Sequence, residues 1–538
     1  MGTAGTMLPP GVSRGDFNKA LDEFRTAVGA DWVFSSAEDV ALYRDAYSPL
    51  WGEAEERVAS AAVAPITVEQ VQAVVRTANK YKIPLYPVST GMNLTYGGSA
   101  PAYSGSVVVD LKRMNRILEV SESGAYALVE PGVSYFDMYR YLRDNKIKLW
   151  VDTPDPGWGS LLGNAMDRGG GYTASDFRDH FGAHCGMEVV LGNGEVLRTG
   201  NGAIPNSKSW QQHKYGIGPW VDGIFSQSNF GIVTKMGFWM MPEPEGALQV
   251  SVQSAKHDDV HRHLDLLSNL MYQQIIPSQS GISSPAMGGP MSDELLSLRT
   301  RAGGASSAEW DRYAQSKNRK FWTSNITFYG PPKLTAAQWE YVKERFSAEI
   351  PGATFTERGS FKFPLTDAQA DAVQDKPSLG IPSLNLFGSR NGPNDAPRGS
   401  HIDFSPIIPR DGASFLKAAN VFARTFAAHG QPVGGAAGAL YHPRGMIMFN
   451  SVAAGKDLET NKTARALFTD LVKVAAENDW APYRVHPIWQ KQVLEVYRYN
   501  DHVLHRFHET LKDAIDPAGI LSPGRYNIWP KRLRGGRA

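Results

Sequence analysis

Residues 85–93 read Leu-Tyr-Pro-Val-Ser-Thr-Gly-Met-Asn, an extended apolar run that ends in a loop around Gly91. A second loop, residues 163–171, reads Gly-Asn-Ala-Met-Asp-Arg-Gly-Gly-Gly. Glycine lets successive backbone N–H groups approach a phosphate closely and form an anion-binding concavity. Neither loop has the spacing of the G-x-G-x-x-G dinucleotide fingerprint or of a P-loop. Each loop alone is typical of an ordinary turn, so the surrounding sequence decides what the pair means.

The sequence around the two loops alternates between helical and extended patterns. Thr67 and Gln70 form a capping box, which predicts that a helix begins after Thr67. Residues 107–109 and 126–129 are short apolar runs that predict buried strands, and residues 135–145 are predicted to be helical. The turn Asn193-Gly194 predicts a hairpin over residues 187–197. This half of the chain is therefore a mixed helix and strand region.

A second region is expected to begin near the linker Pro242-Glu243-Pro244-Glu245-Gly246. Beyond it, strands are expected between helices, and a further helix over 501–515 is expected to stop at Asp516-Pro517. A cluster of Gly, Pro, Asn and Asp at 390–399 predicts a long loop. The expected helices of this second region lie near 256–272, 335–349, 413–429 and 461–478.

Composition excludes several classes of protein. The 538 residues are 42% hydrophobic and 20% charged, which indicates a globular protein of more than one domain. Lys plus Arg is 55 and Asp plus Glu is 54, a balance that argues against nucleic-acid binding. No apolar run approaches the ~20 residues that span a bilayer. The single cysteine, Cys185, excludes an intramolecular disulfide and fits a reducing compartment, so we expect a cytoplasmic protein without a signal peptide.

The order of the motifs is specific. The motifs follow one another at residues 87–93, 96–98, 130–133, 154–160, 163–173, 186–190, 227–237 and 522–525. This series resembles the flavoproteins of the vanillyl-alcohol oxidase and p-cresol methylhydroxylase family, in particular the bacterial eugenol-oxidase-like 4-phenol oxidases. The resemblance spans nearly the whole chain. It implies an α+β fold with two domains, of which one is a PCMH-type FAD-binding domain and the other an inserted α+β cap domain.

The resemblance implies domain boundaries as well. Residues 1–245 would form the FAD-binding domain with its core at about 57–242, and residues 246–495 would form the cap, or substrate, domain. Residues 496–538 would be a C-terminal segment that returns to the FAD domain. The family also implies a homodimer or a higher homo-oligomer.

FAD is the cofactor that the resemblance implies, with no metal. His401, by itself an ordinary strand histidine, stands where oxidases of this group bind the flavin covalently through an 8α-histidyl bond. The p-cresol enzyme uses a tyrosine from a nearby loop, but this chain has no Tyr between 381 and 400. The other expected cofactor-binding residues are Ser89, Thr90, Gly91, Met92, Asn93, Pro154, Gly163, Asn164, Arg168, Gly169, Ile232 and Arg525.

Four residues match the catalytic positions of the family. Tyr96, Tyr483 and Arg484 are similar to a trio that binds the substrate as a phenolate, although neighbouring residues of a regular strand would point apart. A cation and two hydroxyls directed at a phenol oxygen favour its ionised form. Asp155 matches the aspartate near the flavin, although Thr-Pro-Asp-Pro-Gly is also ordinary turn chemistry. Burial would raise the pKa of such an aspartate and suit it to proton transfer.

The chain departs from the family in its expected substrate pocket. Residues 433–440 read Val-Gly-Gly-Ala-Ala-Gly-Ala-Leu, with Gly434 where relatives carry a larger residue facing the substrate. Asp403 stands where eugenol oxidase has glycine. Small residues on a pocket wall would enlarge it and admit bulky, lignin-derived phenols. The alternative is that these glycines serve close packing of strands.

The resemblance predicts a 4-phenol oxidase. The phenol would lose a hydride from its para benzylic carbon, passing through a quinone methide, and O2 would be the final acceptor. A dehydrogenase or hydroxylase that passes electrons to a cytochrome or another acceptor is the alternative. The chain has no Cys-x-x-Cys-His haem motif, so a cytochrome would be a separate partner. A non-catalytic flavin-binding scaffold is the alternative from another class.

Overall fold

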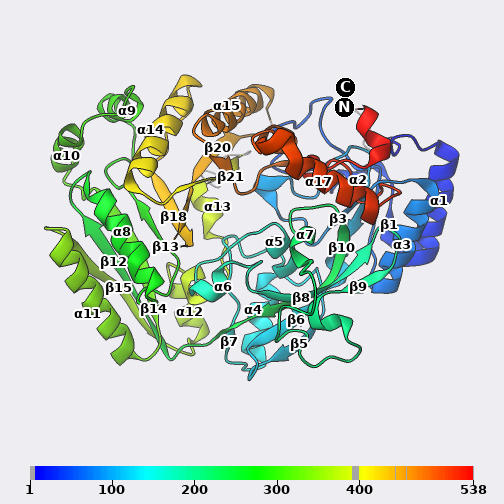
Figure 1. Cartoon of the computed structure of the whole chain (residues 1–538), viewed down its shortest axis with the longest axis horizontal. Helices are drawn as coiled ribbons and strands as arrows, with labels where there is room; N and C mark the ends of the chain where they lie inside the picture. The colour runs from blue at the N-terminus through cyan, green and yellow to red at the C-terminus, as the bar shows by residue number, and fades with distance from the viewer. Residues whose placement is uncertain (1–6, 391–398, 443, 456, 537–538) are drawn as a thin grey trace.

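The computed structural model describes residues 7–390, 399–442, 444–455 and 457–536 (Figure 1). The part of the chain up to about residue 245 forms two larger sheets, drawn from blue to green on the right of Figure 1, and a two-stranded sheet of β7 (Leu149–Trp150) and β11 (Met241–Pro242). The first sheet has the order β1-β2-β4-β3, in which β2, β4 and β3 are parallel. Helices α1 and α3 pack beside it through the same apolar cluster. These elements are α1 (Arg14–Val28), β1 (Val33–Phe34), β2 (Ala61–Val63), α3 (Val68–Tyr81), β3 (Leu85–Val88) and β4 (Val107–Asp110).

The helix predicted after Thr67 is α3. The Thr67 hydroxyl accepts a hydrogen bond from the Gln70 N–H at 3.3 Å, as a helix cap does. The Gln70 side chain binds the N–H of Ile66, at 2.8 Å, rather than that of Thr67. The capping prediction is therefore confirmed for the hydroxyl, and the return bond lies one residue earlier than in a capping box.

The second sheet is antiparallel and has the order β5-β6-β10-β8-β9. The predicted hairpin is confirmed as β8 and β9, with Val190 opposite Val196 and Gly194 in the left-handed region at φ 84°. Helix α4 (Tyr135–Asp144) follows β6, and α5 (Leu161–Met166) begins the second glycine loop. The strands are β5 (Ile117–Ser121), β6 (Tyr126–Val129), β8 (His184–Leu191), β9 (Val196–Arg198) and β10 (Gly231–Trp239).

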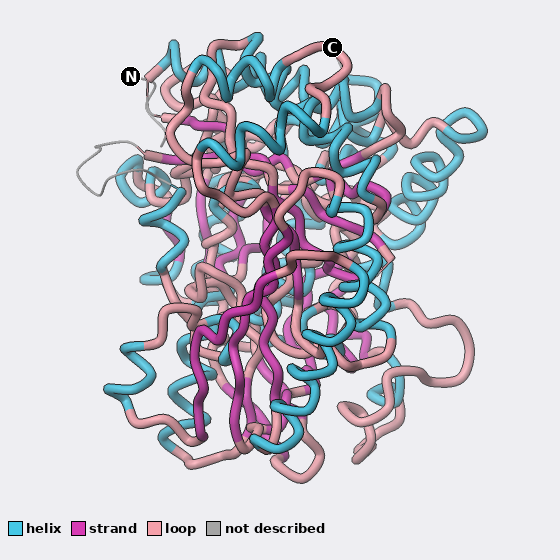
Figure 2. Tube along the Cα trace, turned by 90° about the vertical axis from the view of Figure 1, so that its left-hand side faces the viewer, coloured by secondary structure: helices cyan, strands magenta, loops and turns pink. Residues whose placement is uncertain are grey.

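The second region is built on an eight-stranded sheet with the order β15-β12-β14-β13-β18-β19-β17-β21. Its four predicted helices are confirmed to within a few residues as α8 (Asp259–Tyr272), α11 (Pro332–Glu349), α14 (Gly412–Ala428) and α15 (Leu458–Ala476). Figure 2 shows long strands along the middle of the molecule with helices outside them. The strands are β12 (Gly246–Ser254), β13 (Ser280–Ser283), β14 (Trp322–Tyr329), β15 (Thr354–Lys362), β17 (Pro406–Pro409), β18 (Ala437–His442), β19 (Gly445–Met448) and β21 (Ala481–Pro482).

Three predictions for the chain beyond residue 245 are not fully matched by the structure or fall partly on residues that it does not describe. Strand β18 begins at Ala437, so residues 433–436 precede the strand. Helix α17 (Tyr499–Ile515) contains left-handed residues at positions 500–502, so its regular part begins after the first residues. Most of the loop predicted at 390–399 lies outside the described residues. A separate pair of strands, β16 (Ser400–Phe404) and β20 (Asn450–Ala454), carries His401.

The C-terminal segment returns to the first region. Leu85 N–H donates to the Ile520 carbonyl at 2.7 Å and Ser522 N–H donates to the Leu85 carbonyl at 2.8 Å, which adds a short parallel bridge to the edge of β3. Lys512 on α17 is fully buried and donates to the carbonyls of Asn229 and Leu521, each at 2.6 Å, and to Asp516 at 2.8 Å. This ammonium fixes the segment that leads to residue 525. No helix in the described parts of the chain has the length and apolar character needed to cross a membrane.

We expect Lys512→Met to destabilise the protein by about 3–5 kcal/mol, because it leaves Asp516 as an unpaired buried charge. Burial is the largest influence on Lys512 and lowers its pKa, while Asp516 opposes that effect. The measurement is the urea concentration at half-unfolding, which should fall. Lys531→Met, at an exposed position, is the control and should leave the midpoint unchanged. Equal midpoints for the two variants would contradict this role of Lys512.

Candidate active site

A cavity of about 290 Å³ lies where loops of the first region meet β16, the segment after β21 and the C-terminal segment. Its walls come from parts of the chain that are more than 400 residues apart. Of the residues predicted from the sequence, those that line it are Ser89, Thr90, Gly91, Met92, Asn93, Tyr96, Pro154, Asp155, Gly163, Asn164, His401, Asp403, Arg484 and Arg525. The fold therefore brings most of the predicted site together.

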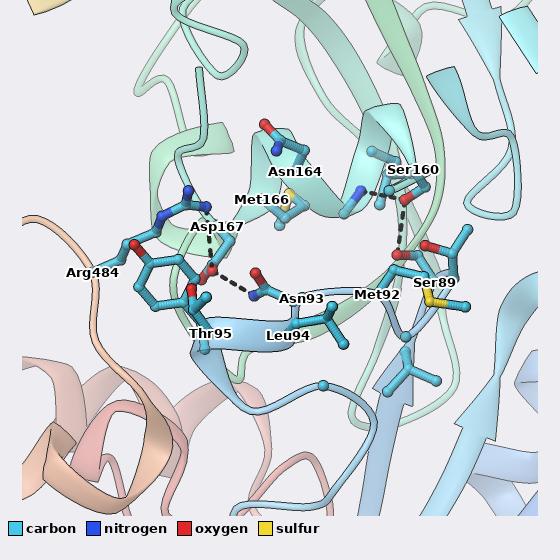
Figure 3. Close-up of a pocket in the computed structure, with 18 of the residues that line it drawn as sticks. Ser89, Met92, Asn93, Leu94, Thr95, Ser160, Asn164, Met166, Asp167 and Arg484 are labelled. Carbon is cyan, nitrogen blue, oxygen red and sulfur yellow. Dashed lines mark hydrogen bonds and ion pairs between the residues drawn. The ribbon is translucent and has the colours of Figure 1, made fainter. Parts of the chain in front are cut away.

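The two glycine loops are in direct contact. Ser160 Oγ donates to Ser89 Oγ at 2.8 Å and accepts from the Gly163 N–H, also at 2.8 Å (Figure 3). A Cβ on Gly163 would overlap the Ser89 hydroxyl. A Cβ on Gly91 would overlap the Ser99 hydroxyl, and Gly91 has φ 71°. Both glycines are thus required by close approach, and the loops form one wall of the cavity.

Five predicted residues do not line the cavity: Arg168, Gly169, Ile232, Gly434 and Tyr483. The Arg168 guanidinium donates to Ser226 Oγ at 3.1 Å, and Ile232 belongs to the apolar core between the sheet and helices of the first region. Gly169 lies against the Asn164 side chain, where a Cβ would overlap the amide. Gly434 is exposed, and a Cβ there would meet nothing within 4 Å.

The two interpretations of the small-residue stretch near β18 can be compared with the structure at Gly438 and Gly434. A Cβ on Gly438 would lie 2.6 Å from the Met446 sulfur, so Gly438 serves close packing of strands. Gly434 serves neither that packing nor the described cavity wall. An enlarged pocket at Gly434 therefore stays a prediction.

His401 lies on β16, opposite Ala453, and its side chain is buried. The Tyr47 ring packs edge-on against its imidazole with 5.6 Å between ring centres. Nε2 lies 3.8 Å from Asp403 Oδ2, and Asp403 Oδ1 accepts from Ser451 Oγ at 2.8 Å. Strand pairing and these neighbours hold the imidazole at the cavity wall.

Tyr96, Tyr483 and Arg484 converge. Arg484 Nε donates to the Tyr483 hydroxyl at 2.8 Å, and the guanidinium carbon lies 4.2 Å from the centre of the Tyr96 ring. Strand β21 ends at Pro482, so residues 483 and 484 lie in a bend and need not point apart. Burial raises the pKa of Tyr96 well above its ordinary value, and Tyr483 adds to the rise while Arg484 opposes it. Tyr96 therefore keeps its proton at neutral pH.

The bend that carries Arg484 is fixed by buried contacts. His486 Nε2 lies 2.7 Å from Asp45 Oδ2, and both side chains are about 4% exposed. Gln227 Nε2 donates to the Tyr483 carbonyl at 3.0 Å. A Cβ on Gly97 would meet Pro487 at 2.7 Å, which places the loop after Tyr96 against the same bend. These contacts position the arginine relative to Tyr96.

Sequence reasoning missed Asp167, a buried carboxylate at the centre of the site. It accepts from Asn93 Nδ2 at 2.7 Å and from the Tyr526 hydroxyl, and it lies 3.8 Å from Arg484 Nη1 (Figure 3). Arg525 Nη2 is 3.5 Å away. Asp167 is thus a shared counter-charge for two arginines. Its place inside the motif 163–171, between predicted cofactor residues, is the signal that could have identified it.

A second buried network lies behind Asn164. His180 bridges Asp152, at 2.8 Å, and the Asn164 side-chain oxygen, at 2.6 Å. A Cβ on Gly171 would overlap the Asp152 carboxylate. Gly169 and Gly171 are therefore needed for packing against this network, a purpose that the composition of the loop alone does not reveal.

Asp155 lies on the cavity wall and accepts from the Leu386 N–H at 3.4 Å. Burial is the largest influence on its carboxyl and raises its pKa, while the hydrogen bonds from Leu386 and Ser383 oppose the rise. A carboxyl with a raised pKa can exchange a proton nearer to neutral pH than an ordinary aspartate. The expected proton-transfer chemistry at Asp155 is consistent with this environment.

Comparison with known proteins identifies the family. Residues 59–200 match the FAD binding domain model, and residues 408–526 match the model of the C-terminal domain of FAD linked oxidases. The chain is 34% identical over 525 residues to the 4-cresol dehydrogenase [hydroxylating] flavoprotein subunit of Pseudomonas putida, covering 97% of this chain and 98% of that protein. The chain belongs to the 4-cresol dehydrogenase family of FAD flavoproteins.

Solved structures of this family superpose over nearly the whole chain. The 4-ethylphenol oxidase of Gulosibacter chungangensis has a TM-score of 0.82 at 32% identity, covering 98% of this chain and all of that one. Substrate-bound p-cresol methylhydroxylase has a TM-score of 0.83 at 32% identity, covering 97% of this chain and 99% of that one. The predicted α+β, PCMH-type FAD-binding fold is thereby confirmed, and the chain is an FAD-linked oxidoreductase.

The cavity residues fit FAD, the cofactor of this family. Ser228 lines the cavity, and its buried hydroxyl has no hydrogen-bond partner among the described residues. The first glycine loop, residues 89–93, lines the cavity and can present backbone N–H groups to a phosphate. In the second loop, the N–H groups of residues 163, 164, 167–169 and 171 are hydrogen-bonded within the protein. The Arg525 side chain is 14% exposed. Burial lowers its pKa, but Tyr86, Tyr526 and Asp167 outweigh that effect and the net pKa is raised. A polar anion with an aromatic ring system suits such a lining. No cluster of three or more His, Cys, Asp or Glu side chains that could hold a metal is found in the described parts.

Proposed function

We propose that this flavoprotein oxidises para-substituted phenols at the benzylic carbon, with O2 as the electron acceptor. The observation that supports this proposal best is the contact of Arg484 with the Tyr483 hydroxyl and with the Tyr96 ring. Arg484 and Tyr96 line the cavity. The names of two relatives refer to 4-alkylphenols, 4-cresol and 4-ethylphenol. A guanidinium with two tyrosines suits the oxygen that such substrates share.

The trio would bind the substrate as a phenolate. A free phenol has a pKa of about 10, and a nearby cation favours its ionised form. The raised pKa of Tyr96 keeps its hydroxyl protonated, so it can donate a hydrogen bond to the phenolate oxygen. Asp167, 3.8 Å from Arg484 Nη1, is a counter-charge for the guanidinium, whose Nε donates to the Tyr483 hydroxyl.

The phenolate would supply the electron pair for oxidation. Electron density pushed from the oxygen into the ring favours loss of a hydride from the para benzylic carbon and yields a quinone methide. FAD, when bound, supplies the hydride acceptor. Asp155, whose pKa is raised by burial, would take a proton from water as the water adds to that carbon.

His401 would attach the FAD covalently, because a neutral imidazole is nucleophilic enough to form the bond. We expect the yellow colour to stay in the pellet when the wild-type protein is precipitated with acid, and to appear in the supernatant for His401→Ala. His429→Ala is the control and should behave like the wild type. The His429 imidazole is paired with Asp470. Colour that leaves the wild-type pellet completely would contradict the covalent bond.

The identity of the acceptor is tested with a panel of 4-alkylphenols scored in parallel for peroxide and for cytochrome reduction. Peroxide formed in proportion to phenol consumed supports the oxidase. Cytochrome reduction without peroxide would favour the dehydrogenase alternative. The specific observation behind this alternative is that the Pseudomonas relative is named a dehydrogenase flavoprotein subunit. No turnover of any phenol by FAD-loaded protein would refute the proposal.

The proposal includes bulky, lignin-derived phenols as substrates, on the basis of the small residues at 433–436. Turnover of 4-ethylphenol compared with a dimeric lignin-type phenol tests this part separately. A strong preference for 4-ethylphenol would refute the enlarged pocket. We also propose the domain boundaries 1–245, 246–495 and 496–538 and assembly as a homodimer or higher oligomer, which sedimentation analysis would test.

A further inference from the structure

A second cavity of about 410 Å³ lies between the end of α4 and the segments 363–365 and 379–381. It is distinct from the cavity that carries Arg484, and no predicted site residue lines it. The short strand β7 (Leu149–Trp150), paired with β11 (Met241–Pro242), forms one wall. Figure 1 shows α4, β7 and α12 (Asp367–Ala372) close together at the bottom, where the two regions meet.

The interior of this cavity is apolar. Leu149, Trp150 and Leu379 line it, and each is less than 8% exposed. The Trp150 and Phe363 rings meet edge-on with 4.6 Å between their centres. Apolar cavities of several hundred cubic ångströms with aromatic walls are typical of small-molecule sites. A flat aromatic body can pack beside such rings.

Cations predominate among the charged residues that line the cavity. Arg143 is already paired with Asp367 at 2.6 Å and donates to the Leu365 carbonyl at 3.1 Å. Neither Lys146 nor Lys148 forms an ion pair with any described residue. Glu243 is the acidic residue of the lining, and it accepts from Trp150 Nε1 at 3.3 Å. Two ammonium groups therefore remain available to an anion.

We propose that this second cavity is a binding site for a small aryl carboxylate. The aromatic ring lies among Trp150, Phe363 and Leu379, and the carboxylate faces Lys146 and Lys148. The combination of an apolar interior with unpaired cations selects an amphipathic anion over a neutral aromatic compound, which gains nothing from the ammonium groups, and over a purely polar anion, which gains nothing from the rings.

The first cavity is a competing site for the same probe, because Arg484 also attracts carboxylates. The two cavities are neighbours: Val151 lines the second and Asp155 the first, and Gly157 N–H donates to the Ser383 carbonyl at 2.8 Å between them. A variant of Arg484 separates the two possibilities, since Arg484 lines only the first cavity.

The experiment is calorimetric titration of the FAD-loaded protein with 3-phenylpropanoate and with its neutral isostere, 3-phenylpropanamide. We expect the carboxylate to bind at least tenfold more tightly than the amide. Lys146→Gln combined with Lys148→Gln should weaken carboxylate binding at least tenfold and leave amide binding unchanged. Leu379→Trp, which fills the cavity, should abolish binding of both, and Arg484→Met should leave carboxylate binding unchanged.

Three results would overturn the proposal. They are the absence of carboxylate binding at millimolar concentration, equal affinity for carboxylate and amide, and loss of carboxylate binding in Arg484→Met with retention in Leu379→Trp. The double lysine variant lies at the protein surface, so it tests the charge requirement even if Leu379→Trp fails to fold. Sedimentation of the wild type with and without the probe tests whether a second copy of the chain covers the cavity instead; a dimer that the probe dissociates supports a ligand site, and a dimer that excludes the probe overturns it.

Discussion

Arg484→Met is expected to lower kcat/KM for 4-ethylphenol by about 10²–10³-fold at neutral pH, the usual effect of removing one preorganised electrostatic contact at a reacting centre. The guanidinium lies beside the Tyr483 hydroxyl and over the Tyr96 ring, so its loss removes the only cation of the trio. Without it, ionisation of the bound phenol must follow the ordinary phenol pKa of about 10. Steady-state kinetics across pH 6–10 provide the measurement.

The pH dependence separates this role from a structural one. If Arg484 acts by favouring the phenolate, the deficit of the methionine variant should shrink as pH approaches 10, because the substrate then ionises by itself. Arg506→Met, at an arginine half-exposed on α17, is the control and should match the wild type. A deficit that is constant with pH would contradict the proposed role.

Asp155→Asn is expected to lower kcat by about 10²–10⁴-fold, the usual contribution of a general base. Burial raises the pKa of Asp155, so the wild-type rate should fall as pH falls through that raised value, where the base becomes protonated. The asparagine variant should lose this acidic limb of the pH profile. A profile with the same acidic limb in both proteins would assign the limb to another group.

Stability should respond to Asp155→Asn in the opposite sense to activity. A carboxyl with a raised pKa binds its proton more tightly in the folded state, so its contribution to stability is fully present below the unfolded pKa of about 3.9 and is lost as pH rises through the folded value. Where pH exceeds the folded pKa, the ionised, half-buried Asp155 is therefore a cost. The variant should be at least as resistant to urea as the wild type, which thermal or urea unfolding at pH 7 would show.

The sequence was sufficient for features that depend on local pattern. The cap at Thr67, the hairpin at Gly194 and the four helices of the second region follow from neighbouring residues alone, because a helix or turn is set by contacts a few positions apart. The family motifs also selected Ser89, Asp155 and His401, which line one cavity in the structure.

Contacts between distant parts of the chain could not be predicted in this way. Asp45 and His486 are 441 positions apart, and nothing in either neighbourhood indicates the other. Arg484 converges with Tyr483 because the chain leaves β21 at Pro482, whereas alternation along a strand would separate them. Asp167 looked like part of a turn, since its role as a counter-charge appears only when Arg484 and Arg525 are brought beside it.

The state of a bound phenol tests the central claim most directly. 4-Fluorophenol has no benzylic hydrogen, so it binds without being oxidised, and its ¹⁹F chemical shift distinguishes phenol from phenolate. At pH 7, where the free compound is protonated, the molecule bound to the wild-type protein should have the phenolate shift and the molecule bound to Arg484→Met should have the neutral shift. A neutral shift in the wild-type complex would contradict the account.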